Sequence, residues 1–172
     1  QYNTPGNFTV TLTVTDQFGL TDQATASITV TNTPPVAAFT ATPSSGVSPL
    51  NVNFDASGST DPNDSIASYS WDFGEPGTPA GSGINTSHTY ITPGTYTATL
   101  TVTDSFGLND QTTTSITVTN TPPVASFSAT PFEGTVPLNI AFDASGSSDP
   151  NDSIVSYDWD FGEPGAPRRV AG

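Results

Sequence analysis

Short runs in which apolar and polar residues alternate recur along the whole chain and predict β-strands. Residues 66–73 are the clearest example, since Tyr69, Trp71 and Phe73 fall on one face of an extended backbone. Threonine and valine dominate the other runs, and both suit a half-buried pleated surface. Turn-forming Gly, Pro, Asn and Asp separate the runs, and no segment has a helical period. The pattern therefore predicts an all-β fold.

The pattern repeats with a period of 88 residues. Thr33-Pro-Pro35 returns as Thr121-Pro-Pro123, and residues 33–77 match residues 121–165 at 34 of 45 positions. Self-similarity at a fixed period is typical of a tandem array. The repeat divides the chain into three parts: residues 1–32 as the C-terminal half of a unit, residues 33–120 as a complete unit, and residues 121–172 as the N-terminal half of a unit.

The complete unit is expected to form an immunoglobulin-like β-sandwich. About seven short strands, with Trp71 on the third and Tyr96 at the start of the sixth, are typical of that fold. The strand patterns lie at residues 36–42, 50–54, 66–73, 84–91 (a weak region), 95–103 and 112–119. The side chains expected to point inward are Phe39, Leu50, Val52, Phe54, Tyr69, Trp71, Phe73, Tyr96, Ala98, Leu100, Val102, Ile116 and Val118.

The two partial units are the complementary halves of such a sandwich. Residues 121–172 supply the first three strands, and residues 1–32 supply the end of the fifth strand with the sixth and seventh. Neither half closes a sandwich alone, because each exposes an apolar face and open strand edges. One interpretation is a piece of a longer array. The other is head-to-tail complementation, in which strands of one copy complete the half-unit of the next and the contact propagates as a filament.

The charge balance limits the possible partners. Sixteen acids and two bases give the chain a net charge of −14, and there is no lysine. Nucleic acid and anionic membranes are therefore poor partners, whereas cations are plausible ones. No apolar run is long enough for a spanning helix, so membrane insertion is not expected. The chain has no cysteine, which excludes disulfides and thiol chemistry.

The sequence contains few residues that could act in catalysis. His88 is the single histidine, and it falls in a predicted strand rather than beside an oriented serine and a pocket. The acids lie in turn-forming loops without a predicted cleft between them, which argues against a paired-carboxylate mechanism. We therefore expect no catalytic residues.

A metal site is the stronger candidate. In an antiparallel sandwich, the linker, the loop after the second strand and the end of the sixth strand lie at one end of the module. Oxygen ligands from several loops fit Ca²⁺, but the same residues could instead only form Asx turns. The candidates are Asn32, Thr33, Asp61, Asn63, Asp64 and Asp104, and then Asn120, Thr121, Asp149, Asn151 and Asp152, with Asp16 as the counterpart of Asp104. If strands are exchanged, Asp16 of another copy completes the second set.

Three motifs resemble the PKD (polycystic kidney disease) domain. They are Trp71-Asp-Phe-Gly74, the preceding Phe54-Asp-Ala-Ser-Gly-Ser-Thr-Asp-Pro62, and His88-Thr-Tyr-x-x-Pro-Gly-Thr-Tyr-x-x-x-Leu-x-Val-x-Asp104. The resemblance covers essentially the whole chain and implies a seven-stranded sandwich of extracellular proteins that serves as a spacer, an adhesion module or an accessory module. Some members bind calcium beside the interdomain linker. The chain departs from the family at Glu75-Pro-Gly77, where Asp-Gly is frequent.

Together these observations predict a non-catalytic, extracellular or cell-surface module of a stalk or fibre. Calcium is expected to stiffen its joints, and its partners are adjacent repeats or other copies of itself. The alternative is an accessory substrate-binding or spacer module of a secreted hydrolase. The ending Arg168-Arg-Val-Ala-Gly172 departs from the repeat, and the sequence leaves open whether it forms an edge strand or a chain terminus.

Overall fold

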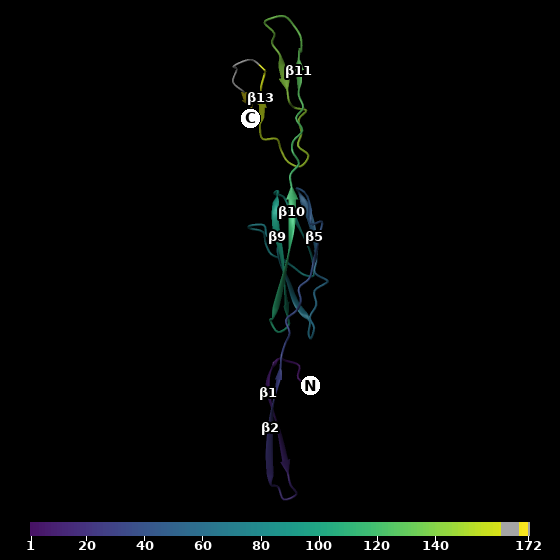
Figure 1. The fold of residues 1–172 in the computed structure, drawn as a ribbon, viewed down its shortest axis with the longest axis vertical. Coiled ribbons are helices and arrows are strands. Elements are labelled where there is room, and N and C mark those ends of the chain that lie inside the picture. The colour runs from purple at the N-terminus through teal and green to yellow at the C-terminus, as the bar shows by residue number, and fades with distance from the viewer. Residues whose placement is uncertain (163–168, 172) are drawn as a thin grey trace. The chain divides into compact units, whose positions relative to one another are not determined.

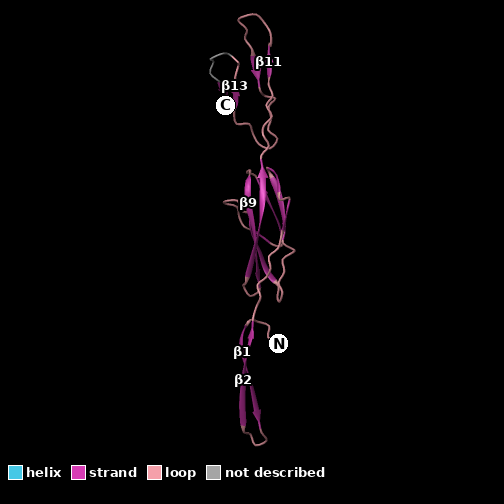
Figure 2. Ribbon diagram, in the orientation of Figure 1, coloured by secondary structure: helices cyan, strands magenta, loops and turns pink. Residues whose placement is uncertain are grey.

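The computed structural model describes residues 1–162 and 169–171, and within them every regular element is a β-strand (Figures 1 and 2). The chain divides into two compact units, each discontinuous in sequence. The first comprises Gln1–Thr42, Asn53–Thr86 and Thr97–Thr114, and the second comprises Pro43–Val52, Ser87–Tyr96 and Ser115–Gly172. The described residues contain no helix that is long and apolar enough to cross a membrane.

Eight strands of residues 33–120 form two sheets, as an all-β sandwich requires. One sheet has the order β4-β10-β9-β6-β7 and the other has the order β3-β5-β8. The strands are β3 (Thr40–Thr42), β4 (Ser45–Val47), β5 (Leu50–Asp55), β6 (Ile66–Asp72), β7 (Gly81–Ser82), β8 (Asn85–Tyr90), β9 (Gly94–Asp104) and β10 (Asn109–Thr119).

An aromatic cluster joins the two sheets within the first unit. The rings of Phe54 on β5 and Trp71 on β6 have centroids 5.4 Å apart, and Phe39 meets Trp71 edge-on at 5.0 Å and 84°. On β9, Leu100 stands opposite Trp71 and Val102 stands opposite Tyr69. Leu100, Val102 and Trp71 have no exposed surface, so β9 closes the core around the tryptophan.

The predicted core is confirmed, with a few differences. Of the thirteen positions expected to point inward, ten are buried, while Phe39, Tyr69 and Tyr96 are half-buried. Tyr90 is fully buried. Its inward orientation was not predicted, because apolar and polar residues alternate only weakly over residues 84–91. Its ring stacks on Tyr96 with centroids 4.6 Å apart.

The strand boundaries differ from the sequence prediction at the sheet edges. The expected first strand at residues 36–42 is reduced to β3 and an isolated bridge between Val36 and Thr60. The weak region forms β8, with the short β7 before it. The unpredicted β4 pairs in parallel with the end of β10, where Thr117 stands opposite Ser45.

Residues 121–162 and 169–171 repeat the first half of this fold. Strand β11 (Ser128–Thr130) pairs with β12 (Ala141–Asp143), and β13 (Tyr157–Trp159) pairs with β14 (Arg169–Ala171). Both registers are those of β3 with β5 and β6 with β7, shifted by 88 residues. The tail therefore contributes an edge strand at Arg169–Ala171, while Arg168 lies outside the described residues.

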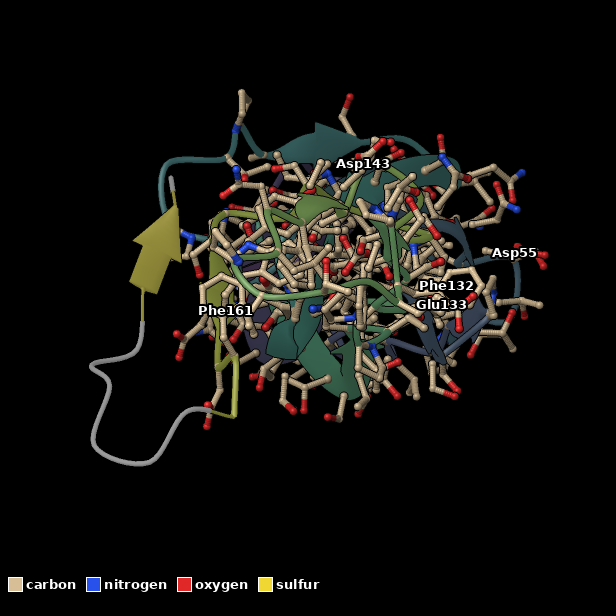
Figure 3. All side chains as sticks on the ribbon, turned by 90° about the horizontal axis from the view of Figure 1, so that it is seen from above. Asp55, Phe132, Glu133, Asp143 and Phe161 are labelled. Atoms are coloured by element: carbon tan, nitrogen blue, oxygen red, sulfur yellow. The ribbon has the colours of Figure 1, made fainter. Side chains whose placement is uncertain are left out.

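Local turns are repeated as faithfully as the strand registers. The backbone N–H of Ser57 donates to Asp55 Oδ1 at 2.8 Å, and that of Ser145 donates to Asp143 Oδ1 at the same distance (both acids are labelled in Figure 3). These bonds lower the pKa of both carboxyls, because they favour the ionised form. The turn after the second strand pattern thus has the same hydrogen bond in both repeats.

The first 32 residues form a hairpin, and among the described residues its two strands pair with no strand but each other. Strand β1 (Gly6–Thr15) runs antiparallel to β2 (Thr21–Val30). Its apolar face is exposed: 62% of Leu12 and 54% of Val14 are accessible to solvent. The hairpin therefore has the strand pattern of a buried element but carries no core of its own.

Candidate functional site at the linker

Three hydrogen bonds in series tie the linker to two loops of the complete unit. The backbone N–H of Thr33 donates to Asn63 Oδ1 at 3.1 Å, and Asn63 Nδ2 donates to Asn32 Oδ1 at 2.7 Å. Asn32 Nδ2 then donates to Asp104 Oδ2 at 2.5 Å. We call this series the linker relay. It joins the linker to the loop after β5 and to the end of β9.

The linker relay has a direction that its two ends impose. A backbone N–H can only donate, and an ionised carboxylate can only accept. Between the Thr33 amide and the Asp104 carboxylate, each asparagine must therefore accept with its oxygen and donate with its nitrogen. Reversing either side-chain amide would set two donors or two acceptors against each other. The orientation of Asn32 and Asn63 is thus determined by the chemistry of the relay.

Asp104 is the buried charge on which the relay ends. Only 3% of its surface is exposed. Its Oδ1 accepts the backbone N–H groups of Phe106 and Leu108, both at 2.9 Å, and these bonds shape the turn from β9 into β10. With the bond from Asn32, three N–H donors face this carboxylate. Burying a charge is costly unless such hydrogen bonds compensate it, so Asp104 depends on the linker.

Asp61 stands beside the relay with one oxygen unused. Its Oδ1 accepts the backbone N–H groups of Asn63 and Asp64, each at 3.0 Å, which forms the loop. Its Oδ2 is buried and has no hydrogen-bond partner among the described residues. Leaving a buried acceptor unsatisfied costs about 1–3 kcal/mol, and more when the group is charged. An orphaned carboxylate oxygen of this kind is suited to a cation.

Asp64 links the same loop to the turn after β9. Its Oδ2 accepts the hydroxyl of Ser105 at 2.7 Å, and its Oδ1 accepts the backbone N–H of Ser65. The hydrogen bond from the Ser105 side chain is the main reason why the pKa of the Asp64 carboxyl lies below its ordinary value. Sequence reasoning missed Ser105, although its position directly after Asp104 could have indicated it.

The structure thus connects all six candidates of the first set through hydrogen bonds: Asn32, Thr33, Asp61, Asn63, Asp64 and Asp104. Within the described part of the chain, no three acidic or histidine side chains are grouped so as to hold a metal by themselves. A cation here would therefore rely on Asp61 together with amide and backbone oxygens.

The second set repeats the relay but stops one step earlier. The backbone N–H of Thr121 donates to Asn151 Oδ1 at 3.1 Å, and Asn151 Nδ2 donates to Asn120 Oδ1. The Oδ1 of Asp149 accepts the N–H groups of Asn151 and Asp152, at 3.1 and 3.0 Å. No acid corresponding to Asp104 follows in residues 121–162 and 169–171, which end after the counterpart of β7.

Asp16, the predicted counterpart of Asp104, forms the same turn in the hairpin. Its Oδ1 accepts the backbone N–H groups of Phe18 at 2.8 Å and Leu20 at 2.9 Å. It belongs to the first unit, whereas the second set belongs to the second unit. The structure therefore shows the turn that Asp16 makes, and completion of the second set stays a prediction.

The histidine is part of the packing. His88 lies half-buried on β8, and its ring meets that of Tyr90 edge-on at 4.6 Å and 88°. This contact is the structural role expected for a residue in a strand.

Comparisons with known proteins agree with this fold. The family model described as PKD domain matches residues 32–119. A structure of carbohydrate-binding modules from the β-sandwich superfamily, described as having promiscuous specificity, matches with 33% identity and a TM-score of 0.50. That match covers 59% of this chain and 47% of the other, so the chain spans about half of that protein.

Two single domains from bacteria are also similar in sequence. The PKD1 domain of the metalloprotease PrtV of Vibrio cholerae is 34% identical, with 50% of this chain and 98% of that chain covered and a TM-score of 0.43. The PKD1 domain of Vibrio anguillarum Epp is 34% identical, with 51% and 96% covered and a TM-score of 0.44. Since the family model matches half of the chain, on the segment that carries the two-sheet sandwich, the chain belongs to the PKD domain family.

Proposed function

We propose that this chain is a non-catalytic spacer of an extracellular stalk or fibre, in which each linker is held stiff against the module that follows it. The linker relay from Thr33 to Asp104 is the observation that carries the proposal. PKD domains are generally non-catalytic modules, which supports the absence of chemistry in the proposal. A linker that only connected two domains would not need hydrogen bonds to two separate loops.

Calcium is the cation that we propose for the same joint. The orphaned Asp61 Oδ2 fits it, since Ca²⁺ takes six to eight oxygen ligands that include carboxylates, amide oxygens and backbone carbonyls. Asp61 would supply a charged ligand, and the oxygens of the linker and of the loop after β5 would complete the shell. The ion would supply positive charge to a chain with a net charge of −14 and would add a further tie between linker and loop.

Thermal unfolding in calcium and in EDTA tests the metal. Calcium that binds only the folded state at 100 times its Kd raises the free energy of unfolding by about 2.7 kcal/mol. We expect the unfolding midpoint, followed by tryptophan fluorescence, to rise in calcium for the native chain. Asp61→Asn should lose most of that rise, because it keeps the Oδ1 acceptor and removes the charge of the orphaned oxygen.

A matched control is Asp72→Asn, which also removes one charge but lies on an exposed residue whose Oδ1 accepts Gly74 N–H at 2.8 Å. This variant should keep the calcium response. Equal midpoints in calcium and EDTA for the native chain would remove the metal from the proposal and leave the linker relay to stiffen the joint alone.

A second candidate function is an accessory module of a secreted hydrolase. The similarity to a structure of carbohydrate-binding modules favours it. Against it, Trp71 is fully buried and cannot form a stacking platform for sugars. Retention of the chain on insoluble polysaccharide would support this candidate, and lack of retention on a range of polysaccharides would favour the spacer.

A further inference from the structure

The sequence contains four Asn-x-Ser/Thr motifs, the acceptor sequence for N-linked glycans. They begin at Asn7, Asn63, Asn85 and Asn151. A glycan is bulky and polar, so a folded chain accommodates it only where the asparagine amide faces solvent and takes no part in the fold. The four motifs differ in this respect.

Two of the four asparagines have their amide nitrogen bound to a linker. Asn63 Nδ2 donates to Asn32 Oδ1 at 2.7 Å, and Asn151 Nδ2 donates to Asn120 Oδ1. Their amide oxygens are bound as well, each by the backbone N–H of the residue after the linker asparagine. A sugar on either nitrogen would crowd the linker and disturb these contacts.

A third asparagine uses its amide within the hairpin. Asn7 stands opposite Thr29, whose hydroxyl donates to Asn7 Oδ1 at 2.8 Å. This hydrogen bond orients the amide toward the neighbouring strand. Three of the four motifs thus contribute side-chain hydrogen bonds to the fold, which leaves the motif at Asn85.

Asn85 is the first residue of β8, and its side chain is exposed. Along β8 the even-numbered side chains are half-buried or buried, so those of Asn85 and Ser87 lie on the solvent-facing side. Within the described residues, neither of these two side chains forms a hydrogen bond. The amide and the hydroxyl that define the motif therefore face solvent together.

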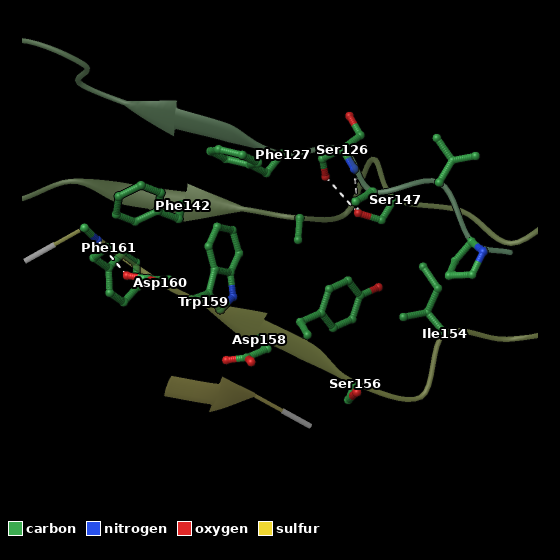
Figure 4. A pocket seen from close by; sticks show the side chains of 16 residues that line it. Ser126, Phe127, Phe142, Ser147, Ile154, Ser156, Asp158, Trp159, Asp160 and Phe161 are labelled. Atoms are coloured by element: carbon green, nitrogen blue, oxygen red, sulfur yellow. Dashed lines mark hydrogen bonds between the residues drawn. The ribbon is translucent and has the colours of Figure 1, made fainter. Parts of the chain in front are cut away.

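The Ser87 hydroxyl differs from the serines that the fold uses. Ser59 Oγ donates to Ala38 O at 2.9 Å and accepts the backbone N–H of Ala38 at 3.0 Å. Ser147 forms the same two hydrogen bonds with Ser126, at 2.8 and 2.9 Å (Figure 4). Those hydroxyls hold two segments together, whereas the Ser87 hydroxyl is accessible to an enzyme that recognises the motif.

Strand β8 is attached to β5 along one side. Before Asn85, the backbone N–H of Ala56 donates to Ile84 O at 2.9 Å. Near the other end of β8, Asn51 Nδ2 donates to Thr89 Oγ1 at 2.8 Å. Because β8 is the last strand in the order β3-β5-β8, its other side is a sheet edge within the described residues.

This edge lacks the usual protection against strand addition. Natural sheet edges are blunted by lysine, by other charges or by proline. Strand β8 reads Asn-Thr-Ser-His-Thr-Tyr and contains no Lys, Arg, Asp, Glu or Pro. An oligosaccharide on Asn85 is wider than the spacing of about 4.8 Å between neighbouring strands, so it would cover the open side of β8.

We propose that Asn85 carries an N-linked glycan that shields the β8 edge. The donor is an oligosaccharide on a lipid phosphate carrier. Asn85 Nδ2 forms a bond to C1 of the first sugar, the bond between C1 and the phosphate oxygen of the carrier breaks, and the amide loses one proton to a base of the transferase. The proposal rests on the extracellular location in the proposed function, but it requires neither calcium nor a stiff linker.

Occupancy of the secreted chain tests the site. The full chain is secreted from cells that attach N-linked glycans, and the occupancy of each asparagine is measured by mass spectrometry. Peptides with each motif, glycosylated by membranes of the same cells, correct for the preference of the transferase. After this correction we expect occupancy at Asn85 to exceed that at Asn63 and Asn151 by about tenfold. Equal corrected occupancy would overturn the proposal. The calcium and linker experiments use chain without glycans, so either proposal can fail alone.

Two variants remove the motif in different ways. Ser87→Ala keeps Asn85 but removes the hydroxyl, and Asn85→Gln removes the acceptor itself. Both should abolish the glycan on β8. The matched control is Ser115→Ala, the same change at an exposed position of β10 outside any motif, which should keep the glycan. A glycan that persists on β8 in Ser87→Ala, or one that is lost in Ser115→Ala, would overturn the assignment.

Sedimentation velocity tests the shielding. The chain without glycan should associate at about threefold lower concentration than the glycosylated chain, because its β8 edge is open. Ser87→Lys also lacks the glycan but places a lysine on the edge, so it should associate as weakly as the glycosylated chain. Ser87→Ala should associate like the chain without glycan. Equal association of the glycosylated and unglycosylated chains would overturn the shielding role.

Discussion

Asp104 shows how much a single carboxylate contributes to this fold. It is 3% exposed, it fixes the turn between β9 and β10 through two backbone N–H groups, and it terminates the linker relay. The same turn at Asp16 lacks the bond from the linker. The residue therefore has a local role, which both turns use, and a role at the joint, which only the complete unit displays in the described residues.

The variant Asp104→Asn separates these two roles. An asparagine keeps the Oδ1 acceptor for Phe106 and Leu108 but sets an NH₂ group against Asn32 Nδ2. Asn63 must keep its oxygen toward the Thr33 N–H, and Asn32 must keep its oxygen toward Asn63 Nδ2, so neither can rotate to restore the contact. One hydrogen bond is therefore lost and a polar group stays unsatisfied. We expect the free energy of unfolding to fall by about 1–3 kcal/mol, measured by denaturant unfolding. Asp72→Asn should change it by less than about 0.5 kcal/mol, and equal effects would contradict the relay.

The sequence predicted most elements because their residues alternate, and the exceptions have physical causes. Strands β5, β9 and β10 are half-buried and alternate over most of their length, and β6 alternates from Tyr69 onward, after a register shift between Ile66 and Ser68. Strand β4 has three residues, Ser45–Val47, and exists because the end of β10 lies beside it in parallel. Such a tertiary partner leaves no period-two pattern in the sequence.

The candidate site, too, could be predicted from the sequence only in part. The topology of a sandwich sufficed to gather Asn32, Asp61 and Asp104 at one end. The direction of the hydrogen bonds did not follow from residue types, because an asparagine can donate or accept. Nor did the orphaned oxygen of Asp61 or the contribution of Ser105, since both depend on the detailed path of two loops.

The glycine after β6 tests how closely β6 and β9 approach each other. Gly74 has a φ of 73°. A Cβ added there would meet two backbone atoms of Thr97 on β9, the oxygen at 2.5 Å and the nitrogen at 2.8 Å. Gly77 has a φ of 80° but nothing within 4 Å. Both Gly→Ala variants bear the cost of a left-handed backbone, about 1–2 kcal/mol, and Gly74→Ala adds a clash with backbone atoms. We expect Gly74→Ala to lower the unfolding midpoint clearly more than Gly77→Ala. Equal midpoints would contradict this close approach.

One repeat appears along the chain in three degrees of completeness. The complete unit closes its core with β9 and β10, the hairpin is the free counterpart of those two strands, and the half-unit is the free counterpart of the rest. Linker contacts recur at both junctions, with Asn63 and Asn151 bonded in the same way. Both junctions thus share the two bonds between linker and loop, whereas the described residues show the bond to a carboxylate only at the first junction, from Asn32 to Asp104.

Spin-label distances measure the stiffness of the joint between the hairpin and the complete unit directly. Thr25→Cys on β2 and Thr113→Cys on β10 are exposed, equivalent positions on either side of the Asn32–Thr33 linker, and the chain has no other cysteine. Pulsed electron paramagnetic resonance of the dilute, doubly labelled chain should give one narrow distance distribution. Asn63→Ala, which breaks the relay at its centre, should broaden it, while Asn53→Ala on β5 should leave it unchanged. A broad distribution in the native chain would contradict a stiff joint, and the same narrow distribution in Asn63→Ala would contradict the role of the relay in stiffening it.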